Sequence, residues 1–148
     1  MKKLLVLVIS SLIAVSAFAG TPLSDKKKET ALKNIEQVSP EKALADLKSN
    51  KNIILLDVRT DREYEGGHVA GAIWTPRGLL DFKAGKWLKD KSKTYYVYCK
   101  TGGRGSISTY DLKQLGYKAV NIKGGYKALK KSGAKVVSGR AKGFAETE

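Results

Sequence analysis

The sequence predicts one α/β domain, built on an open, mainly parallel sheet with helices on both of its faces. Strand-like and helix-like stretches alternate along the chain, which is typical of parallel strands joined by helices. The apolar run at residues 53–56 shows no alternation with polar residues, as expected of a strand that is covered on both sides. No repeat and no linker separates two folded units, and we expect a single domain over residues 39–132.

The first 19 residues are expected to be a signal peptide. Lys2 and Lys3 precede an apolar run at residues 4–15, and residues 17–19 have the A-x-A form of a cleavage site. The run is shorter than a comfortable membrane span; an uncleaved N-terminal anchor is the alternative. Cleavage after Ala19 leaves enough chain for one domain. Because a start this short and rich in lysine is typical of bacteria, we expect a periplasmic protein.

Composition narrows the class of protein further. The chain has 28 Lys and Arg against 14 Asp and Glu, a formal net charge of +14, and such a charge attracts anions. The lysines are scattered along amphipathic stretches and accompany no nucleic-acid motif, so we expect no nucleic-acid partner. With one cysteine and one histidine, an intrachain disulfide is excluded and a transition-metal site is not expected.

Residues 20–38 are expected to be an N-terminal extension. The segment opens polar and rich in lysine, and the spacing of Leu32, Ile35 and Val38 then predicts a short amphipathic helix. The apolar side of this helix has two potential partners. It packs either on its own domain or on a second subunit, and in the second case the protein would be a homodimer.

The domain itself is expected to follow in regular alternation. Ser39 as N-cap and Pro40 in the first turn predict the start of a helix. The later elements expected are a strand at 53–56, helical turns at 60–65, a strand at 72–74, a helix around 79–82, a loop at 86–93, a strand at 94–98, a helix at 106–115 with Ile107, Leu112 and Leu115 facing inward, a strand at 119–122 and a helix at 126–131. Residues 133–148 are expected to be a polar C-terminal tail.

Cys99 stands between the end of a predicted strand and a glycine-rich loop that leads into a helix. Ligands of such sheets bind beyond the carboxyl ends of the strands. Backbone N–H groups converge there, at the positive end of the helix dipole. With Lys100 and Arg104 beside it, this environment favours the thiolate form of the cysteine.

The loop has the form C-x4-R. Its glycines allow a tight turn whose N–H groups point inward and form an anion-binding nest. A thiolate there can attack an electrophilic sulfur, hold it as a persulfide and pass it to an acceptor. Arg104 can offer a planar fork of donors to the sulfonate of a donor such as thiosulfate. The predicted catalytic residues are Cys99 and Arg104, and the predicted substrate-binding residues are Lys100, Thr101, Gly102, Gly103 and Gly105.

Three motifs closely resemble those of rhodanese-like domains. They cover about residues 38–131, in the family's order and spacing. The motifs are Leu55-Leu56-Asp57-Val58-Arg59 with Glu63-Tyr64 and Gly67-His68-Val69-Ala70-Gly71-Ala72-Ile73, then Cys99-Lys100-Thr101-Gly102-Gly103-Arg104, and last Leu115-Gly116-Tyr117 with Val120-Asn121-Ile122-Lys123-Gly124-Gly125. The resemblance implies a rhodanese fold, sulfurtransferase activity, Cys99 as persulfide carrier, and no metal or organic cofactor.

Two departures from the family pattern stand out. The residue after the arginine is usually alanine or serine; here it is Gly105, which is expected to loosen the start of the helix. The last motif often continues to a tryptophan, whereas Tyr126 and Leu129 occupy that stretch here. The extension and the Cys-Lys-Thr loop are similar to periplasmic single-domain members that carry polysulfide sulfur.

Phosphatase or arsenate chemistry is the main alternative at this loop. Related phosphatase folds use a longer C-x5-R loop, and the position of that arginine is occupied by Gly105. The loop therefore has the length of a sulfurtransferase loop. His68 is expected to be a structural, hydrogen-bonded residue and not a general base, and Asp57 with Arg59 to form a buried ion pair that supports the fold.

Two hypotheses of different classes follow. In the first, the protein is an enzyme that moves sulfane sulfur from thiosulfate or polysulfide to cyanide, a thiol or a protein. In the second, it binds polysulfide sulfur and delivers it to a membrane partner with little turnover alone. Both predict a small anionic sulfur donor, and a protein acceptor is open in both.

Overall fold

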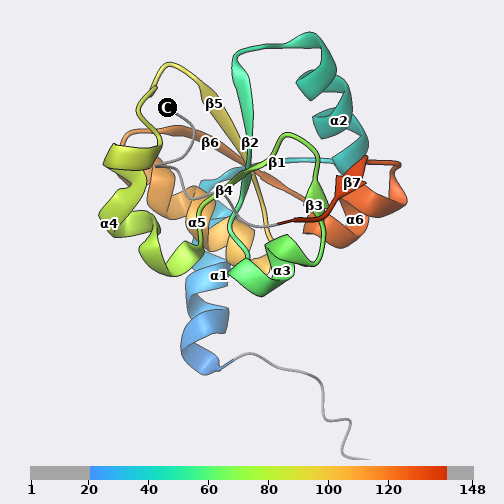
Figure 1. The fold of residues 1–148 in the computed structure, drawn as a ribbon. Coiled ribbons are helices and arrows are strands. Elements are labelled where there is room, and N and C mark those ends of the chain that lie inside the picture. The colour runs from blue at the N-terminus through green and yellow to red at the C-terminus, as the bar shows by residue number, and fades with distance from the viewer. Residues whose placement is uncertain (1–20, 140–148) are drawn as a thin grey trace, which may run out of the picture.

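A five-stranded sheet forms the centre of the structure, a computed structural model that describes residues 21–139. Its strands lie in the order β1-β6-β5-β2-β4 and all neighbours are parallel (Figure 1). The predicted fold class is confirmed. The strands are β1 (Glu36–Val38), β2 (Ile53–Asp57), β4 (Ile73–Trp74), β5 (Thr94–Tyr98) and β6 (Lys118–Ile122).

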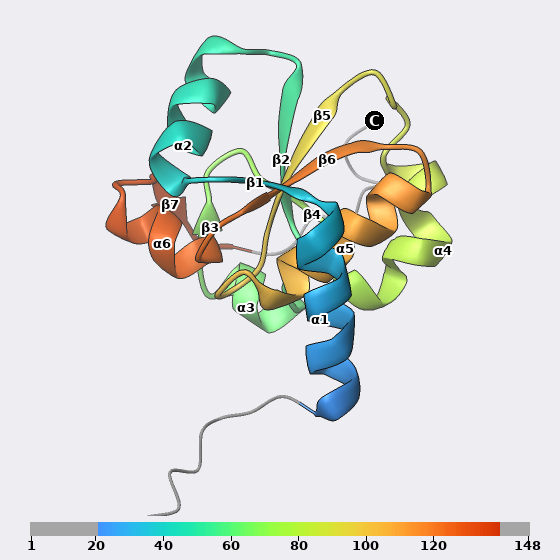
Figure 2. The same cartoon turned by 180° about the vertical axis from the view of Figure 1, so that it is seen from behind.

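Helices cover both faces of this sheet. Helices α4 and α5 pack on one face and α1 lies along α5, while α2 and α6 pack on the other face (Figures 1 and 2). A short helix, α3, follows the end of β2. The helices are α1 (Pro22–Asn34), α2 (Pro40–Ser49), α3 (Asp61–Glu65), α4 (Arg77–Trp87), α5 (Gly103–Gln114) and α6 (Gly125–Lys131).

The central strands bury side chains on both faces, which explains their continuous apolar sequences. Leu56 joins the core beneath α4 and α5, and its neighbour Leu55 joins the core beneath α2 and α6. In β5, Val97 and Tyr98 divide in the same way. Since successive strand residues point to opposite sides, a strand covered twice needs apolar residues at every position, and the prediction from residues 53–56 is confirmed.

The N-terminal extension differs from its prediction. Helix α1 ends at Asn34, and the backbone of Ile35 is already extended. Residues 36–38 form β1, which pairs with β6 and buries Val38. An edge strand leaves a row of N–H and C=O groups open, and β1 covers that row on β6. The apolar spacing at 32, 35 and 38 therefore belongs to two elements, and the sheet begins before residue 39.

Two further boundaries and one inward-facing residue were also predicted wrongly. Helix α4 runs to Trp87 and takes in part of the predicted loop at 86–93. Helix α5 begins at Gly103, three residues before its predicted start. The prediction started too late because glycines, which have a low helix propensity, occupy the first turn of this helix. Leu115, expected to face inward, caps the end of α5 and is 39% exposed.

The start of the predicted tail is also ordered. Val136–Val137 forms β7, which pairs antiparallel with β3 (His68–Val69). The Ala70 N–H donates to the Lys135 carbonyl oxygen at 2.9 Å, which extends this contact. The predicted signal peptide at 1–19 and the rest of the tail, 140–148, lie outside the described residues. Within residues 21–139, no helix has the length and apolar character to span a bilayer.

Candidate active site

Cys99 lies directly beyond the end of β5, at the carboxyl edge of the sheet. Cys99 is 1% exposed, and it packs in the core beneath α4 and α5. The neighbouring strand β2 ends at the same level, since Asp57 is paired with Tyr98. The structure thus places the cysteine where the topology of a parallel sheet predicts a ligand site.

The loop after Cys99 brings a backbone N–H group to the sulfur. The Gly102 N–H donates a hydrogen bond to Sγ at 3.1 Å. Gly102 has a φ of 101°, a left-handed conformation that glycine adopts without strain, and α5 begins at the next residue. An N–H group aimed at the sulfur stabilises negative charge on it, as an oxyanion hole does for oxygen.

Helix α6 holds this loop from the other side. The Tyr126 N–H donates to the Cys99 carbonyl oxygen at 2.7 Å, and the Lys127 N–H donates to that of Lys100 at 3.1 Å. A Cβ at Gly125 would overlap the Cys99 carbonyl oxygen, so only glycine permits this approach. The glycine pair of the closing motif therefore positions the loop through direct backbone contact.

Arg104 makes a bidentate ion pair with Glu63 of α3. Its two terminal nitrogens lie 2.7 and 2.8 Å from the two carboxylate oxygens. The side chains are 38% and 25% exposed, respectively. The fork predicted for a sulfonate is thus occupied by a carboxylate, and an incoming anion must use the remaining N–H groups of Arg104, which number three in a guanidinium that donates twice.

Glu63 is a site residue that sequence reasoning missed. It also closes a capping box with Thr60, which fixes its carboxylate at the first turn of α3. The T-x-x-E pattern at residues 60–63 was the available signal, but nothing local shows that the glutamate faces Arg104, 41 residues away. The Glu63 side chain thus joins the turn after β2 to the loop after β5.

The pairing changes the acidity of Glu63. Hydrogen bonds from Arg104 are the main cause that lowers the pKa of Glu63 from 4.5 to about 2, against the opposing effect of burial. The same contact raises the pKa of Arg104. Since the folded-state pKa lies below the ordinary value, the pair stabilises the fold above pH 4.5, and that contribution is lost as the pH falls from 4.5 towards 2.

We therefore expect Glu63→Gln to reduce the sensitivity of the protein to acid. Because both side chains are partly solvated, the pH-dependent contribution should be on the order of 1–2 kcal/mol. Urea unfolding between pH 7 and pH 3 measures it: the free energy of unfolding should fall more steeply in the wild type than in the variant. Glu29→Gln, which removes an exposed pair with Lys33, is the control and should have little effect. Parallel curves for wild type and Glu63→Gln would contradict the prediction.

The predicted substrate-binding residues divide into two groups. Gly102 and Gly105 are buried beside Cys99, and Gly103 is half-buried at the start of α5. Lys100 and Thr101 are exposed at the outer side of the loop. Within residues 21–139, neither of these two side chains bonds to Sγ, and the backbone of Gly102 supplies the hydrogen bond to the sulfur.

The structure explains why residue 105 is glycine in this chain. A Cβ there would lie 2.6 Å from Asn121 Oδ1 and 3.3 Å from the Cys99 N atom. Asn121 is buried on β6 and its Nδ2 donates to Gln37 Oε1 at 3.1 Å. The asparagine therefore fills the space that a small side chain would take at position 105.

We expect Gly105→Ala to destabilise the fold by about 1–3 kcal/mol through this overlap. In an Asn121→Ala background the cost should fall by at least half, since the clashing oxygen is gone and alanine favours the helix over glycine. Chemical unfolding of the four members of this double-mutant cycle measures the coupling. Additive effects would show that Asn121 does not determine the glycine.

Two predicted structural roles are confirmed. Asp57 and Arg59 form a buried ion pair at 2.6 Å, and Arg59 also donates to the Gly67 carbonyl oxygen at 2.8 Å. His68 is buried, with Nδ1 2.9 Å from the Tyr64 carbonyl oxygen and its ring stacked on that tyrosine. Both groups support the turn after β2, and among residues 21–139 neither forms a hydrogen bond or an ion pair with Cys99.

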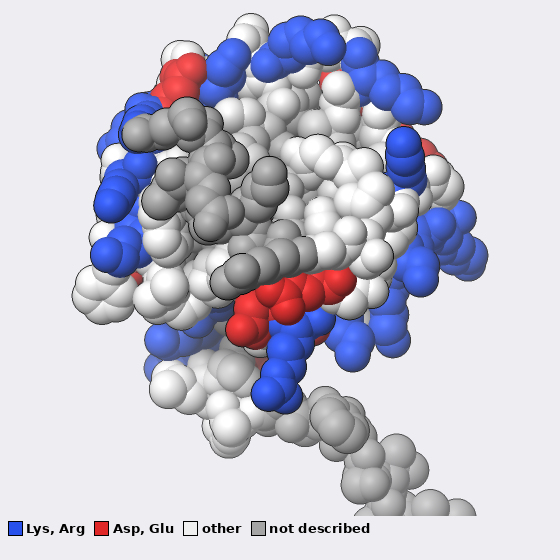
Figure 3. Space-filling model, in the orientation of Figure 1, with Lys and Arg blue, Asp and Glu red and all other residues white. Residues whose placement is uncertain are grey.

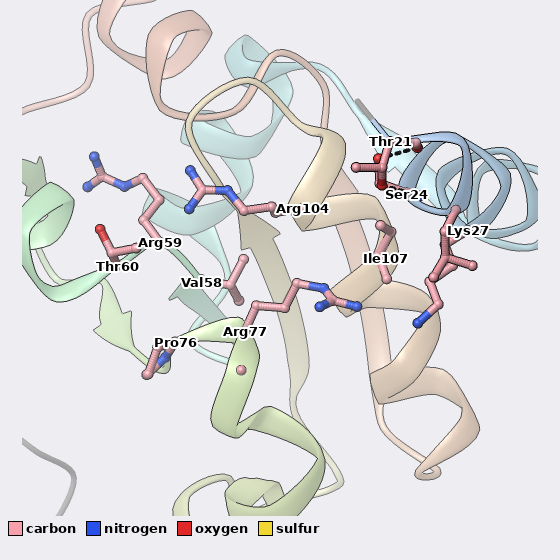
Figure 4. Close-up of a pocket in the computed structure, with 12 residues that line it drawn as sticks. Thr21, Ser24, Lys27, Val58, Arg59, Thr60, Pro76, Arg77, Arg104 and Ile107 are labelled. Atoms are coloured by element: carbon pink, nitrogen blue, oxygen red, sulfur yellow. Dashed lines mark hydrogen bonds between the residues drawn. The ribbon is translucent and has the colours of Figure 1, made fainter. Parts of the chain in front are cut away.

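Two cavities flank the Arg104–Glu63 pair. One of about 480 Å³ lies between α1, α4 and α5 and includes Arg104 in its wall (Figure 4). The other, of about 470 Å³, has Glu63 and Lys100 in its wall. On the face shown in Figure 3, lysine and arginine surround a neutral centre, and acidic groups gather over α3. The walls of the two cavities carry more cations than anions, which attracts anions towards the Arg104–Glu63 pair.

Comparison with known proteins gives consistent matches. The sequence model described as Rhodanese-like domain matches residues 39–132. Thiosulfate sulfurtransferase PspE of Escherichia coli is 33% identical over 74 residues, which are 50% of this chain and 71% of that protein. A sulfurtransferase of Allochromatium vinosum is 26% identical over 105 residues, 70% of this chain and 96% of that protein.

Longer relatives match as well. The probable adenylyltransferase/sulfurtransferase MoeZ of Mycobacterium tuberculosis is 29% identical over 124 residues, which are 83% of this chain but 31% of MoeZ. The chain thus spans about a third of that relative's length, and 46% of the putative sulfur carrier protein YrkF of Bacillus subtilis.

Solved structures agree on the fold. A protein of unknown function from Rhodopseudomonas palustris, described as a possible tyrosine phosphatase, aligns with a TM-score of 0.72 and 24% identity over 82% of this chain and 97% of that one. A rhodanese-like domain protein from Staphylococcus aureus aligns with a TM-score of 0.62 and 26% identity, over 70% of this chain and 100% of that one. The first likeness concerns the fold alone.

Proposed function

Because the chain belongs to the rhodanese-like domain family, we propose that it is a sulfurtransferase in which Cys99 carries sulfane sulfur as a persulfide. The observation that carries this proposal is the hydrogen bond from the Gly102 N–H to Sγ, at the carboxyl edge of a parallel sheet. A sulfur held in this way is suited to bear negative charge in both halves of a transfer cycle.

The donor is thiosulfate or polysulfide. With thiosulfate, the Cys99 thiolate attacks the outer sulfur, the S–S bond of the donor breaks, and sulfite leaves with the bonding electron pair. A nucleophilic acceptor then attacks the outer sulfur of the persulfide, and the cysteine leaves as thiolate. With cyanide as acceptor, the product is thiocyanate. The free N–H groups of Arg104 bind the sulfonate of the donor, and Lys100 adds charge at the mouth.

Export to the periplasm is part of this proposal. The basic start, short apolar run and A-x-A site at residues 17–19 support it. Cysteines of exported proteins usually form disulfides, but Cys99 has no second cysteine in its own chain. A chemical role for its thiol is consistent with this. Fractionation of cells that express the full chain, with N-terminal sequencing of the product, tests export and cleavage after Ala19.

The second candidate is a sulfur-delivery protein with little turnover alone. The cavity that contains Lys100 favours it, because its wall also carries cations from α3 and α6 and would attract an acidic partner surface. The residues concerned are Arg62, Lys127 and Lys130. A delivery protein would load sulfur and keep it in the presence of small acceptors, whereas an enzyme would turn over with them.

The first experiment is the intact mass of the mature protein before and after thiosulfate and, separately, after polysulfide. We expect a gain of one sulfur atom on Cys99, removed by cyanide with release of thiocyanate. The donor that loads faster is the better substrate. Absence of added sulfur from either donor would overturn the sulfurtransferase proposal and direct attention to phosphate esters and arsenate.

A further inference from the structure

Helix α6 and the chain on either side of it present a run of lysines to solvent. Lysine occurs at residues 123, 127, 130, 131 and 135, whereas no Asp or Glu occurs between residues 112 and 145. All five lysines are exposed. Lysine and arginine gather in Figure 3 on the side of the molecule where Figure 1 places α6. The segment therefore concentrates positive charge on this side, without an acidic residue of its own.

Three of these lysines share the outer face of α6. The buried residues of this helix are Gly125 and Leu129, and Leu129 joins the core beneath α2 and α6. Successive residues of a helix are rotated by about 100°, so that Lys127, Lys130 and Lys131 fall in one sector on the side opposite Leu129. We call these three residues the lysine face.

Ion pairs within the fold do not explain the lysine face. Among residues 21–139, none of its members forms an ion pair. On other helices, lysines are paired with acids one turn away, for example Lys33 with Glu29 on α1 and Lys42 with Asp46 on α2. The charge of the lysine face is therefore available to a partner outside this part of the chain.

The energetics of α6 itself oppose this arrangement. Lys127 and Lys131 lie one helical turn apart, and like charges at that spacing repel each other. The helix dipole favours cations in the last turn, which explains Lys130 and Lys131 but not Lys127, which lies in the first turn. A negatively charged partner would offset the repulsion.

Carboxylates near the lysine face do not neutralise it. Glu41 of α2 accepts a hydrogen bond from Ser132 Oγ, directly after α6. Glu63 lines the cavity that also includes Lys127 and Lys130, but its charge is matched by Arg104. In Figure 3 the acidic groups over α3 lie to one side of the lysines and arginines around α6. The surface around α6 thus keeps a net positive charge.

The chemistry of the lysine face favours a lipid surface over a protein. Protein interfaces are enriched in arginine and aromatic side chains and depleted of lysine, and the lysine face contains neither arginine nor an aromatic residue. Lysine is a point charge without the planar fork of arginine, which suits many mobile anionic groups better than a few fixed carboxylates. A second copy of the chain would place like charges opposite each other.

We propose that the lysine face binds the surface of an anionic phospholipid bilayer. Its three ammonium groups contact the lipid phosphates, and Lys123 and Lys135 add charge at the two ends of the segment. Clusters of about four to eight basic residues are typical of such electrostatic binding. The contact is peripheral, since the lysine face contributes no apolar side chain to the bilayer core.

Such docking would orient the candidate active site. The Tyr126 and Lys127 N–H groups of α6 donate to the carbonyl oxygens of Cys99 and Lys100, so the loop is fixed directly to the helix that meets the bilayer. Sulfur carried by Cys99 would then be held near the membrane surface. The lipid contact itself needs no sulfur chemistry, and it is therefore tested separately from the proposed sulfurtransferase function.

Co-sedimentation with phospholipid vesicles tests the lipid contact. The mature protein is used, as in the mass measurement, because the apolar run at residues 4–15 would bind any bilayer. Vesicles of phosphatidylcholine with about 30% phosphatidylglycerol should bind the protein, and vesicles of phosphatidylcholine alone should not. Affinity for the anionic vesicles should fall about tenfold or more as salt rises from about 50 mM to about 500 mM.

Two triple variants of the lysine face separate charge from shape. With Lys127→Gln, Lys130→Gln and Lys131→Gln together, affinity for the anionic vesicles should fall about 100-fold, since each lysine near the surface contributes about fivefold. With arginine at the same three positions the charge is kept, and affinity should stay within about threefold of the wild type.

The matched control replaces Lys26, Lys27 and Lys28 of α1 with glutamine. It removes the same charge from the other side of the sheet, where α1 lies along α5 (Figure 2). Affinity for the anionic vesicles should change less than about threefold, because these lysines are more than a Debye length from a bilayer docked at α6. Thermal unfolding checks that every variant is folded.

Three results would overturn the lipid contact. Equal binding to neutral and anionic vesicles would exclude an electrostatic surface, and equal losses in the α6 and α1 glutamine variants would assign binding to net charge alone. Absence of binding by the folded wild type would exclude lipid and leave an acidic protein as the partner chemistry. Sulfur loading at Cys99, measured by mass on the same samples, is independent of all three results.

Discussion

Cys99→Ala is expected to abolish sulfur transfer while the fold persists. Cys99 is the only cysteine of the chain, and no other side chain can carry sulfane sulfur as a persulfide. The rate of thiocyanate formation from thiosulfate and cyanide should fall by about three orders of magnitude or more. The variant should also gain no mass with either donor. The rate of thiocyanate formation and the gain in mass are independent measurements, and both depend on Sγ of Cys99.

The fold should survive because the loop is held by its backbone. The bonds from Tyr126 and Lys127 use the carbonyl oxygens of Cys99 and Lys100, which the substitution leaves in place. The cost of a small void in the core should be about 1 kcal/mol. Cys99→Ser is the matched control, since it preserves size and hydrogen bonding and removes only the sulfur chemistry. Activity near wild type in Cys99→Ala would refute the persulfide mechanism.

Arg104→Ala is expected to weaken donor binding strongly. The side chain supplies free N–H groups beside the thiol as well as the pair with Glu63. Loss of charge-assisted hydrogen bonds to a sulfonate should raise the KM for thiosulfate about 10- to 100-fold, with a smaller change in kcat, because the nucleophile remains. Steady-state kinetics with thiosulfate varied at fixed cyanide measures both constants.

Two companion variants separate donor binding from structural support. Arg104→Lys keeps the charge but loses the planar fork, and should fall between wild type and Arg104→Ala. The double variant Glu63→Gln with Arg104→Ala no longer leaves a half-buried carboxylate without its partner, so it should regain stability but not the low KM. A collapse of kcat at unchanged KM would instead assign Arg104 to the transition state.

The sequence predicted the reactive loop because that loop is local. Cys99 and Arg104 lie within six consecutive residues, and the strand before them and the glycines between them determine the turn. The doubly covered strands were likewise visible, since every position of residues 53–56 is apolar. Ser39 as N-cap was correct for the same reason, because its side chain accepts from the Lys42 N–H three residues on.

The errors concern contacts between distant parts of the chain. The edge strand β1 exists because β6 offers unpaired backbone groups, and β7 exists because β3 does. Neither segment has the length or the alternation of an independent strand. The error at the start of α5 has a local cause. Glycine has a low helix propensity, so the prediction began the helix after the glycines, but the fixed conformation of the loop makes these glycines helical.

The sequence by itself therefore determined the fold class and the placement of Cys99 and Arg104 in one loop. Tertiary structure alone decided that Glu63 occupies the fork of Arg104, that Asn121 requires glycine at position 105, and that α1 brings Lys27 towards Arg77. The physical reason is the range of the interactions. Turns, caps and apolar periodicity are satisfied within a few residues, whereas an ion pair, a steric limit and a cavity wall depend on which distant elements the packing of the core brings together.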